Sequence, residues 1–438
     1  MTEGAPLPLI FRFMMPLLLG NLVQQTYNMV DAMIVGRLLG SHALASVGAS
    51  TSVQFFILGL CIGCCAGFAI PVAQSFGADD LPAMRRYIWN ALFLTLIITV
   101  IVTVTTSLFC HQILHLIRTP EDIYENAYLY LIVIFLGIPF SMLYNLLSSM
   151  LRAVGNSKMP FVFLTVSAFL NIFLDLFCVA VLHWGCAGTA IATVTSQALS
   201  GTFCLIYILK KVDIIKPRAA ERKLSRRAIR TLLSMGLPMG MTYSITAIGS
   251  MVMQTANNGL GSVYVSGFTA GAKIKQFLLC PFDALGTAAA TFAGQNYGAQ
   301  RLDRVRTGVR QCILVGFFYG VAAGLVMIFA GSALSRLFLT SGYEDAIAAA
   351  AIYLRRMGYF FWVLAVLIIG RSTIQGLGFP GKAVAAGICE MTARTIFSIT
   401  MVPLFAYTAI CFTDQTAWMT AAIYTVIALT RLMKKLDK

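Results

Sequence analysis

The sequence predicts an all-α integral membrane protein of about twelve transmembrane helices in two six-helix bundles. Composition, the length of the apolar runs and an internal repeat carry this prediction. Of 438 residues, 58% are hydrophobic and only 11% are charged, whereas soluble domains carry about 25% charged residues. Lipid accepts only helices or closed barrels, and barrel strands would alternate polar with apolar residues. This composition excludes a soluble enzyme, a disordered chain and a collagen-like chain.

Twelve apolar runs reach the length of about 20 residues that a helix needs to cross a bilayer. The first six lie near 9–35, 43–72, 87–109, 126–150, 160–182 and 186–209. The second six lie near 232–257, 263–294, 308–331, 350–376, 383–405 and 407–430. Each run is therefore expected to form one spanning helix.

The basic residues predict the orientation of these spans. Of the 32 lysine and arginine residues, 24 fall on one side of the membrane, five on the other and three within spans. The minority side holds Arg37, Arg118, Arg336, Arg355 and Arg356. Because Lys and Arg concentrate in cytoplasmic loops, both termini are expected in the cytoplasm. Topology and anionic membrane lipid then account for the net charge of +15, and no nucleic-acid partner is expected.

The two halves of the chain are similar when one is shifted by 221 residues. Gly40-Ser41 falls on Gly261-Ser262, and a polar motif is repeated at the same shift. That motif is Gln74, Gly77, Ala78, Leu81 and Arg85, which falls on Gln295, Gly298, Ala299, Leu302 and Arg306. Since each half has six spans, both halves enter from the same side and the repeat is parallel. The expected organisation is an N-terminal lobe at 1–209, a basic cytoplasmic linker at 210–231 and a C-terminal lobe at 232–438.

Acidic residues inside the apolar spans are the first candidates for function. Four are placed there: Asp31, Asp175, Asp283 and Glu390. A carboxylate at the centre of a bilayer costs at least about 2.5 kcal/mol, so each requires a partner or a function. Asp31 follows Gln24 and Asn28 on the first span, and Asp175 follows Asn171 by one helical turn on the fifth.

Asp31 and Asp175 suit two kinds of role. Together they can exchange a proton, or hold Na⁺ with neighbouring carbonyl and amide oxygens; helix-packing hydrogen bonds are the alternative. Under the repeat, Asp31 falls on Val252 and Asp175 falls on Ser398. The acid pair therefore exists only in the first half. This asymmetry favours a single ion-coupling site over a structural role shared by both halves.

Further residues of the spans are also candidates for function. Glu390 and Arg394 form an i, i+4 pair, either an internal ion pair or part of a cation site. Asp283, two turns after Lys275, is expected to line a cleft. Pro16 removes a backbone hydrogen bond from the first span, which predicts a hinge or a static kink. The candidates for contact with substrate are Gln24, Asn28, Met33, Asp283 and Glu390.

Two further patterns bear on the energy source and on metals. The chain has no Gly-x-x-x-x-Gly-Lys-Ser/Thr motif, so ATP hydrolysis is not expected and an ion or substrate gradient must supply the energy. The cluster of Cys61, Cys64 and Cys65 lacks a Cys or His partner at ligand spacing, so no resident metal or cofactor is expected.

These patterns together resemble the multidrug and toxic compound extrusion (MATE) family over nearly the whole chain. The resemblance rests on Asp31-Ala-Met-Ile-Val-Gly36 after Pro16, on Leu151-Arg152-Ala153-x-Gly155-Asn156, and on Gly294-Gln295-Asn296-x-Gly298-Ala299. It implies a V-shaped pair of lobes and export of cationic or amphipathic drug-like compounds by antiport with H⁺ or Na⁺. The acid positions are similar to those of the DinF-like prokaryotic branch.

The resemblance also implies roles for particular residues. The coupling cation, H⁺ or Na⁺, would bind at Asp31, Asn171 and Asp175. Further polar positions of that site match Tyr130 and Thr193, Asn145 lies near another, and Pro16 matches a bending proline. The chain would be a monomer in a prokaryotic inner membrane, in contact with lipid, and not an enzyme. The alternative is a lipid-linked oligosaccharide flippase, whose anionic pyrophosphate would need cations such as Lys273, Lys275 and Arg394.

Overall fold

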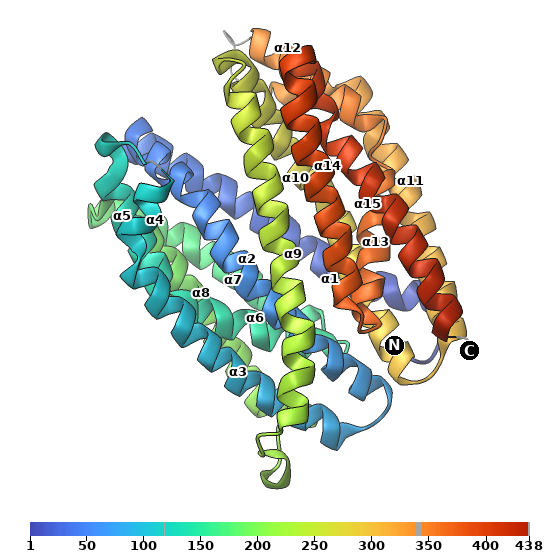
Figure 1. Cartoon of the computed structure of the whole chain (residues 1–438). Helices are drawn as coiled ribbons and strands as arrows, with labels where there is room; N and C mark the ends of the chain where they lie inside the picture. Colours follow the sequence, from blue (N-terminus) through green and yellow to red (C-terminus); the bar gives the residue numbers. More distant parts are fainter. Residues whose placement is uncertain (118, 339–343, 437–438) are drawn as a thin grey trace. The chain divides into compact units, whose positions relative to one another are not determined.

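The computed structural model describes residues 1–117, 119–338 and 344–436, and within them it contains helices and turns but no strand. Two basic residues counted for the topology, Arg118 and Lys438, lie outside this described part. The first half contains α1 (Pro6–Ile34), η1 (Val35–Leu39), α2 (Ser41–Gly77), α3 (Leu81–Leu108), α4 (Cys110–Leu116), α5 (Glu121–Leu136), α6 (Ile138–Ala153), α7 (Lys158–Leu176), η2 (Phe177–Val181) and α8 (Gly185–Lys211) (Figure 1).

The second half begins with two short 3₁₀ turns in the linker, η3 (Asp213–Ile215) and η4 (Ala219–Glu221). Seven helices follow: α9 (Arg226–Asn258), α10 (Ser262–Gly298), α11 (Leu302–Ser335), α12 (Glu344–Gly358), α13 (Val363–Gly376), α14 (Pro380–Phe405) and α15 (Tyr407–Leu436).

Each of the twelve predicted spans corresponds to one helix or to a bent pair of helices. In the described residues, nine single helices are long and apolar enough to cross a membrane, and two bent pairs raise the number to eleven. These pairs are α5 with α6, bent by 46°, and α12 with α13, bent by 63°. Pro139, at the start of α6, has no amide hydrogen to continue the ladder of α5. The remaining predicted span, 232–257, lies in α9. This helix is less apolar because Gly, Ser, Thr and Asn are frequent in it.

The backbone confirms the parallel repeat. Helices α2 and α10 each contain 37 residues and start at equivalent positions. The glycines before them share the left-handed region, with φ of +86° at Gly40 and +101° at Gly261. After these helices, Asp79 and Gln300 also match, each with φ of +58°. Such φ values are uncommon outside glycine, so their recurrence at one shift shows that both halves use the same helix connections.

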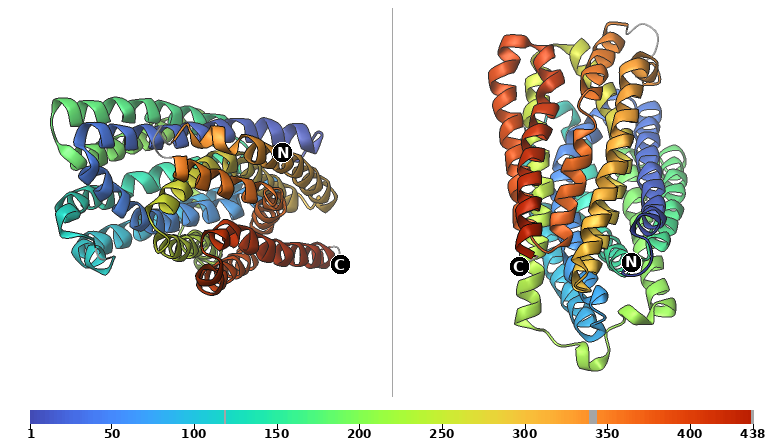
Figure 2. Two further views of the ribbon diagram at one scale, coloured as in Figure 1. Left: turned by 90° about the horizontal axis from the view of Figure 1, so that it is seen from above. Right: turned by 90° about the vertical axis from the view of Figure 1, so that its right-hand side faces the viewer.

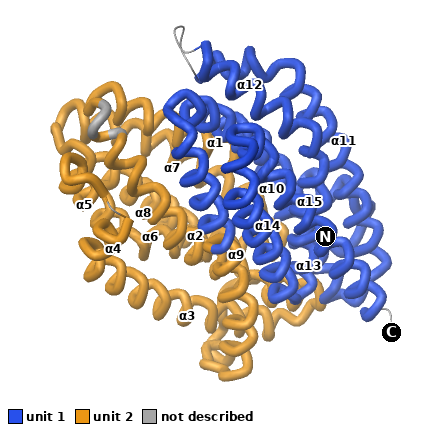
Figure 3. The backbone as a smooth tube through the Cα atoms, turned by 45° about the horizontal axis from the view of Figure 1, so that its top comes forward, with its two compact units in different colours: residues 1–18, 245–438 blue, residues 19–244 orange. Residues whose placement is uncertain are grey.

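The chain forms two compact units, which Figure 3 distinguishes by colour. Unit 1 contains Met1–Leu18 and Ile245–Lys438, and unit 2 contains Leu19–Ser244. The divisions therefore lie inside α1, shortly after Pro16, and inside α9, whereas the sequence placed the division at the linker 210–231. Within unit 1, the start of α1 and the end of α15 lie at the same end (Figures 1 and 2).

Each unit has its own apolar core. In unit 1, Phe282, Tyr353 and Phe361 are fully buried, and the first half of α1 adds Ile10 and Phe13 to the same cluster. The core of unit 2 contains fully buried Phe68, Leu131, Phe135, Ile138 and Leu146. Large apolar side chains are also exposed along many helices, as lipid contact requires.

Glycines allow α2 and the first half of α9 to approach closely within unit 2. A Cβ added to Gly63 would lie 2.6 Å from the Cα of Gly240. Gly63→Ala is therefore expected to lower the free energy of unfolding by about 1–3 kcal/mol through overpacking, measured by thermal unfolding in detergent. Gly48→Ala, on the same helix with open space around its Cβ, is the matched control. It is expected to stabilise slightly; equal effects of the two variants would contradict the close packing.

Candidate functional site

Asp31 of α1 and Asp175 of α7 meet within unit 2. Asp175 is fully buried and Asp31 is half-buried, and their carboxyl groups interact directly. Even so, no hydrogen bond of ordinary geometry to any described residue reaches either oxygen of Asp175 or Oδ1 of Asp31. Buried polar atoms normally have such partners. Three carboxyl oxygens in one place therefore retain an unused capacity to bind a proton or a cation.

An amide and a hydroxyl lie beside the pair. Asn171, one turn before Asp175 on α7, donates from Nδ2 to Oγ1 of Thr193 on α8 at 3.4 Å. The Oδ1 atom of Asn171 is buried and has no partner among the described residues. This orientation leaves a fourth buried oxygen without a partner, on the helix that carries Asp175.

Two tyrosines complete the surroundings of the acids. The phenols of Tyr27 and Tyr130 lie within electrostatic range of both carboxyl groups. Tyr130 interacts with the side chain of Gln54, and Tyr27 with that of Gln24. Sequence analysis missed Tyr27 and Gln54. A signal existed for Tyr27, because it precedes Asp31 by one helical turn and shares its face.

Both acid-bearing helices change their winding next to the acid. Helix α1 passes into the π-helical turn η1 at Val35, and α7 passes into the π-helical turn η2 at Phe177. Such turns are rare and occur frequently at functional sites. The two turns also contact each other within unit 2. The local backbone therefore departs from regular α-helix close to Asp31 and Asp175.

Of the other predicted positions on α1 and α6, Gln24 contacts the group through Tyr27. Gln24 and Asn28 are exposed on α1, and Met33 is 44% exposed. Asn145 donates from Nδ2 to the carbonyl of Ser141 on its own helix at 2.8 Å. Pro16 lies inside α1 as expected.

Unit 1 contains a buried ion-pair network. The predicted Glu390–Arg394 pair is confirmed, with Oε1 and Nη2 2.9 Å apart. Arg371 of α13 pairs with the other oxygen of Glu390 at 3.2 Å. Arg394 continues to Asp414 of α15 at 3.1 Å. The network links α13, α14 and α15.

Asp414 corrects the predicted number of acids within spans. The count of four acids within spans is wrong, because Asp414 lies in the run 407–430, between Thr413 and Gln415, and is 2% exposed. Lys275, two turns before Asp283 on α10, forms an ion pair with Asp414, with Nζ 2.8 Å from Oδ2. Asp283 is exposed instead, and Arg371 is the charged group that acts on it.

The repeat places these two sites at related positions. Tyr130 corresponds to Tyr353 at a shift of 223, and the Tyr353 hydroxyl donates to Asp414 at 3.3 Å. In unit 1 the carboxylates of this region are paired with Lys and Arg, whereas in unit 2 no basic residue among those described forms an ion pair with Asp31 or Asp175. The unpaired acids therefore belong to unit 2.

A repeat of membrane helices around buried polar sites is typical of a multi-pass membrane transporter. The chain belongs to the MATE family: the MatE family model matches residues 16–177 and 238–400. The "probable multidrug resistance protein YpnP" of Bacillus subtilis is 29% identical over 378 residues, covering 86% of this chain and 84% of that protein. The "probable multidrug resistance protein NorM" of Thermotoga maritima is 23% identical, covering 90% and 86%.

A solved structure shows the fold. An outward-facing multidrug resistance MATE family transporter of the MOP superfamily superposes with a TM-score of 0.94. Its sequence is 22% identical, and the match covers 99% of this chain and 97% of that one. The predicted all-α fold of the MATE type is thereby confirmed.

Proposed function

We propose that this chain exports cationic or amphipathic organic compounds in exchange for H⁺ or Na⁺, which binds at Asp31 and Asp175. The names of the Bacillus and Thermotoga relatives support multidrug efflux. The observation that carries the coupling site is the pair of contacting carboxyl groups with three oxygens that lack partners among the described residues. An ionisable group inside a span is a functional candidate by default.

Neutralisation of the acids drives the proposed cycle. Binding of a proton or a cation removes the repulsion between Asp31 and Asp175, so that α1 can repack against its neighbours. Pro16 weakens the hydrogen-bond ladder of α1, close to the position where the division between the two units falls. Substrate is released outward in this step, and the cation leaves toward the cytoplasm as the next substrate binds.

The choice between H⁺ and Na⁺ is open to a direct test. A proton needs one carboxyl oxygen, whereas Na⁺ needs several, for which Asp31, Asp175 and Oδ1 of Asn171 are available. Dye efflux from reconstituted vesicles should be driven separately by a pH gradient and by a Na⁺ gradient. At least one gradient is expected to drive efflux. No response to either would reject the antiport mechanism.

A lipid-linked oligosaccharide flippase is the second candidate. Its pyrophosphate substrate would need several free cations. Lys275 and Arg394 are already paired with Asp414 and Glu390, which leaves Lys273 as the exposed one of the three expected cations. This favours the efflux proposal. Protection of purified protein by cationic dyes, measured beside a lipid-flipping assay, separates the two functions.

We further propose a monomer in the bacterial inner membrane with both termini in the cytoplasm. The basic-residue bias supports this orientation, and the two ends of unit 1 lie on the same side of that unit (Figure 2). A C-terminal epitope tag is expected to become accessible to antibody only after the membrane is permeabilised. Labelling of intact spheroplasts would contradict the orientation.

A further inference from the structure

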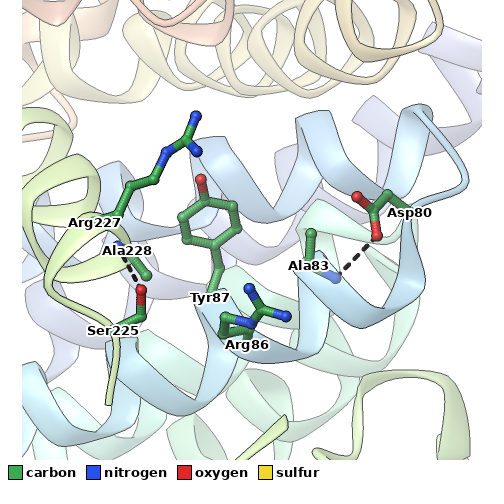
Figure 4. A pocket seen from close by; sticks show the side chains of 7 residues that line it. All are labelled: Asp80, Ala83, Arg86, Tyr87, Ser225, Arg227 and Ala228. Atoms are coloured by element: carbon green, nitrogen blue, oxygen red, sulfur yellow. Dashed lines mark hydrogen bonds between the residues drawn. The ribbon is translucent and has the colours of Figure 1, made fainter. Parts of the chain in front are cut away.

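A cavity of about 270 Å³ opens in unit 2 between the starts of α3 and α9 (Figure 4). Its lining comes from Asp80, Ala83, Arg86, Tyr87, Ser225, Arg227 and Ala228. Sites for drug-sized molecules measure about 300–1,000 Å³, so the volume suits a smaller polar group. The cavity lies on different residues from the acid pair and does not depend on the proposed transport function.

The polar groups of the cavity differ in charge from one end to the other. Figure 4 shows the guanidinium of Arg227 next to the hydroxyl of Tyr87, with Arg86 below them and Asp80 beyond Ala83. Arg86 and Arg227 are exposed, and neither guanidinium forms a hydrogen bond or an ion pair with a described residue. Oδ1 of Asp80 accepts from the backbone N–H of Ala83 at 3.0 Å. Two unpaired cations therefore lie at one end and a carboxylate at the other.

The linker holds the two sides of the cavity together. Arg85, which is buried, donates from Nε to the carbonyl of Ile214 at 2.9 Å and pairs with Glu221 at 3.4 Å. Asn90 accepts from the backbone N–H of Ser225 at 2.9 Å and donates to the carbonyl of Lys223 at 3.1 Å. The start of α9 is thus fixed against α3, and the cavity is formed before any ligand binds.

A stripe of exposed apolar side chains begins two turns further along α3. It consists of Phe93, Ile97, Val100, Val104 and Leu108, which are between 38% and 70% exposed. Their spacing from Arg86 places them on its helix face. At 1.5 Å per residue the stripe is about 22 Å long, longer than one leaflet of a hydrocarbon core that is about 30 Å thick. An acyl chain can lie along it while its headgroup reaches Arg86.

Two side chains near the cavity, Arg222 and Trp89, are of the types found at a membrane interface. The guanidinium of Arg222 lies 5.9 Å from the ring centroid of Trp89 on α3. Tryptophan and arginine are typical of the boundary between hydrocarbon and headgroups. The cavity therefore lies where lipid phosphates are concentrated.

We propose that this cavity binds the headgroup of a zwitterionic aminophospholipid. The phosphodiester is bound by Arg86, Arg227 and the hydroxyl of Tyr87, and the primary ammonium by the free oxygen of Asp80. Charge-assisted hydrogen bonds to a phosphate are among the strong ones, and the carboxylate distinguishes an ethanolamine headgroup from a purely anionic one. The apolar stripe favours a lipid over free phosphate.

The test measures lipid retention by native mass spectrometry after exchange into phosphatidylethanolamine, phosphatidylglycerol or phosphatidylcholine. The wild-type chain is expected to retain phosphatidylethanolamine preferentially. The double variant Arg86→Gln/Arg227→Gln should lower retention of all three by about tenfold, since two charge-assisted contacts are lost. Asp80→Asn should remove the preference and keep binding, because asparagine caps a helix as well as aspartate does.

The matched control is Arg230→Gln/Arg310→Gln, which removes the same charge from exposed arginines outside the cavity. It is expected to retain lipid as the wild-type chain does. Equal loss in the control and in the cavity variant would overturn the proposal in favour of unspecific attraction to the membrane. Inorganic phosphate that displaced lipid from the wild-type chain but not from the control variant would also overturn the proposal. The cavity would then be a site for free phosphate.

Discussion

Replacing Asp175 by asparagine is expected to abolish ion-driven efflux while leaving the protein folded. Asparagine has the same shape but can neither take up a proton nor compensate a bound cation. Efflux of a cationic dye from vesicles should fall roughly 100-fold or more, as expected for an essential intramembrane acid. The unfolding temperature should stay the same or rise, since a buried carboxyl group without hydrogen bonds is costly and Asp175 has none of ordinary geometry.

Asp31→Asn is expected to give the same loss, because both acids hold the same ion. Glu125→Gln, an exposed position on α5, makes the same charge change and should transport normally. If both aspartate variants retained full ion-driven efflux, the coupling site would lie elsewhere. If the variants instead failed to fold, as judged by size-exclusion chromatography, the role of the acid pair would be structural.

Replacing Asp414 by asparagine should have the opposite signature, a loss of stability. Asp414 is the partner of Lys275 at 2.8 Å, of Arg394 at 3.1 Å and of the Tyr353 hydroxyl at 3.3 Å. Removing its charge leaves Lys275 without a counter-charge and Arg394 with Glu390 alone, and breaking a buried ion pair typically costs about 3–5 kcal/mol. The free energy of unfolding should fall by about 3 kcal/mol, because the asparagine oxygen still accepts one hydrogen bond.

A second substitution separates charge from packing at this position. Lys275→Met added to Asp414→Asn removes the stranded ammonium and should recover part of the lost stability. Asp283→Asn, an exposed carboxyl group on the same helix as Lys275, should leave the unfolding temperature nearly unchanged. Wild-type stability in Asp414→Asn, together with lost transport, would instead place Asp414 in an ion-binding site.

Much of the fold was predictable because the spans and the repeat depend on the order of apolar and polar residues in the sequence. Apolar length predicts each span, and the shift of 221 residues predicts the repeat that Gly40 and Gly261 confirm in the backbone. The pair Glu390–Arg394 follows from helical spacing alone. Asp414 is equally visible in the sequence as a charged residue within the apolar run 407–430.

By itself, the sequence determined the class of protein, the positions of the apolar spans, and Asp31 and Asp175 as acids within them that require a partner or a function. Only the tertiary structure decided which of these acids have partners. Asp31 and Asp175 meet without compensating cations, whereas Lys275 reaches Asp414 and not Asp283. The physical reason is that nearly uniformly apolar helices carry little information about their rotation. Packing contacts between distant segments set that rotation, and with it the side chains that face each other.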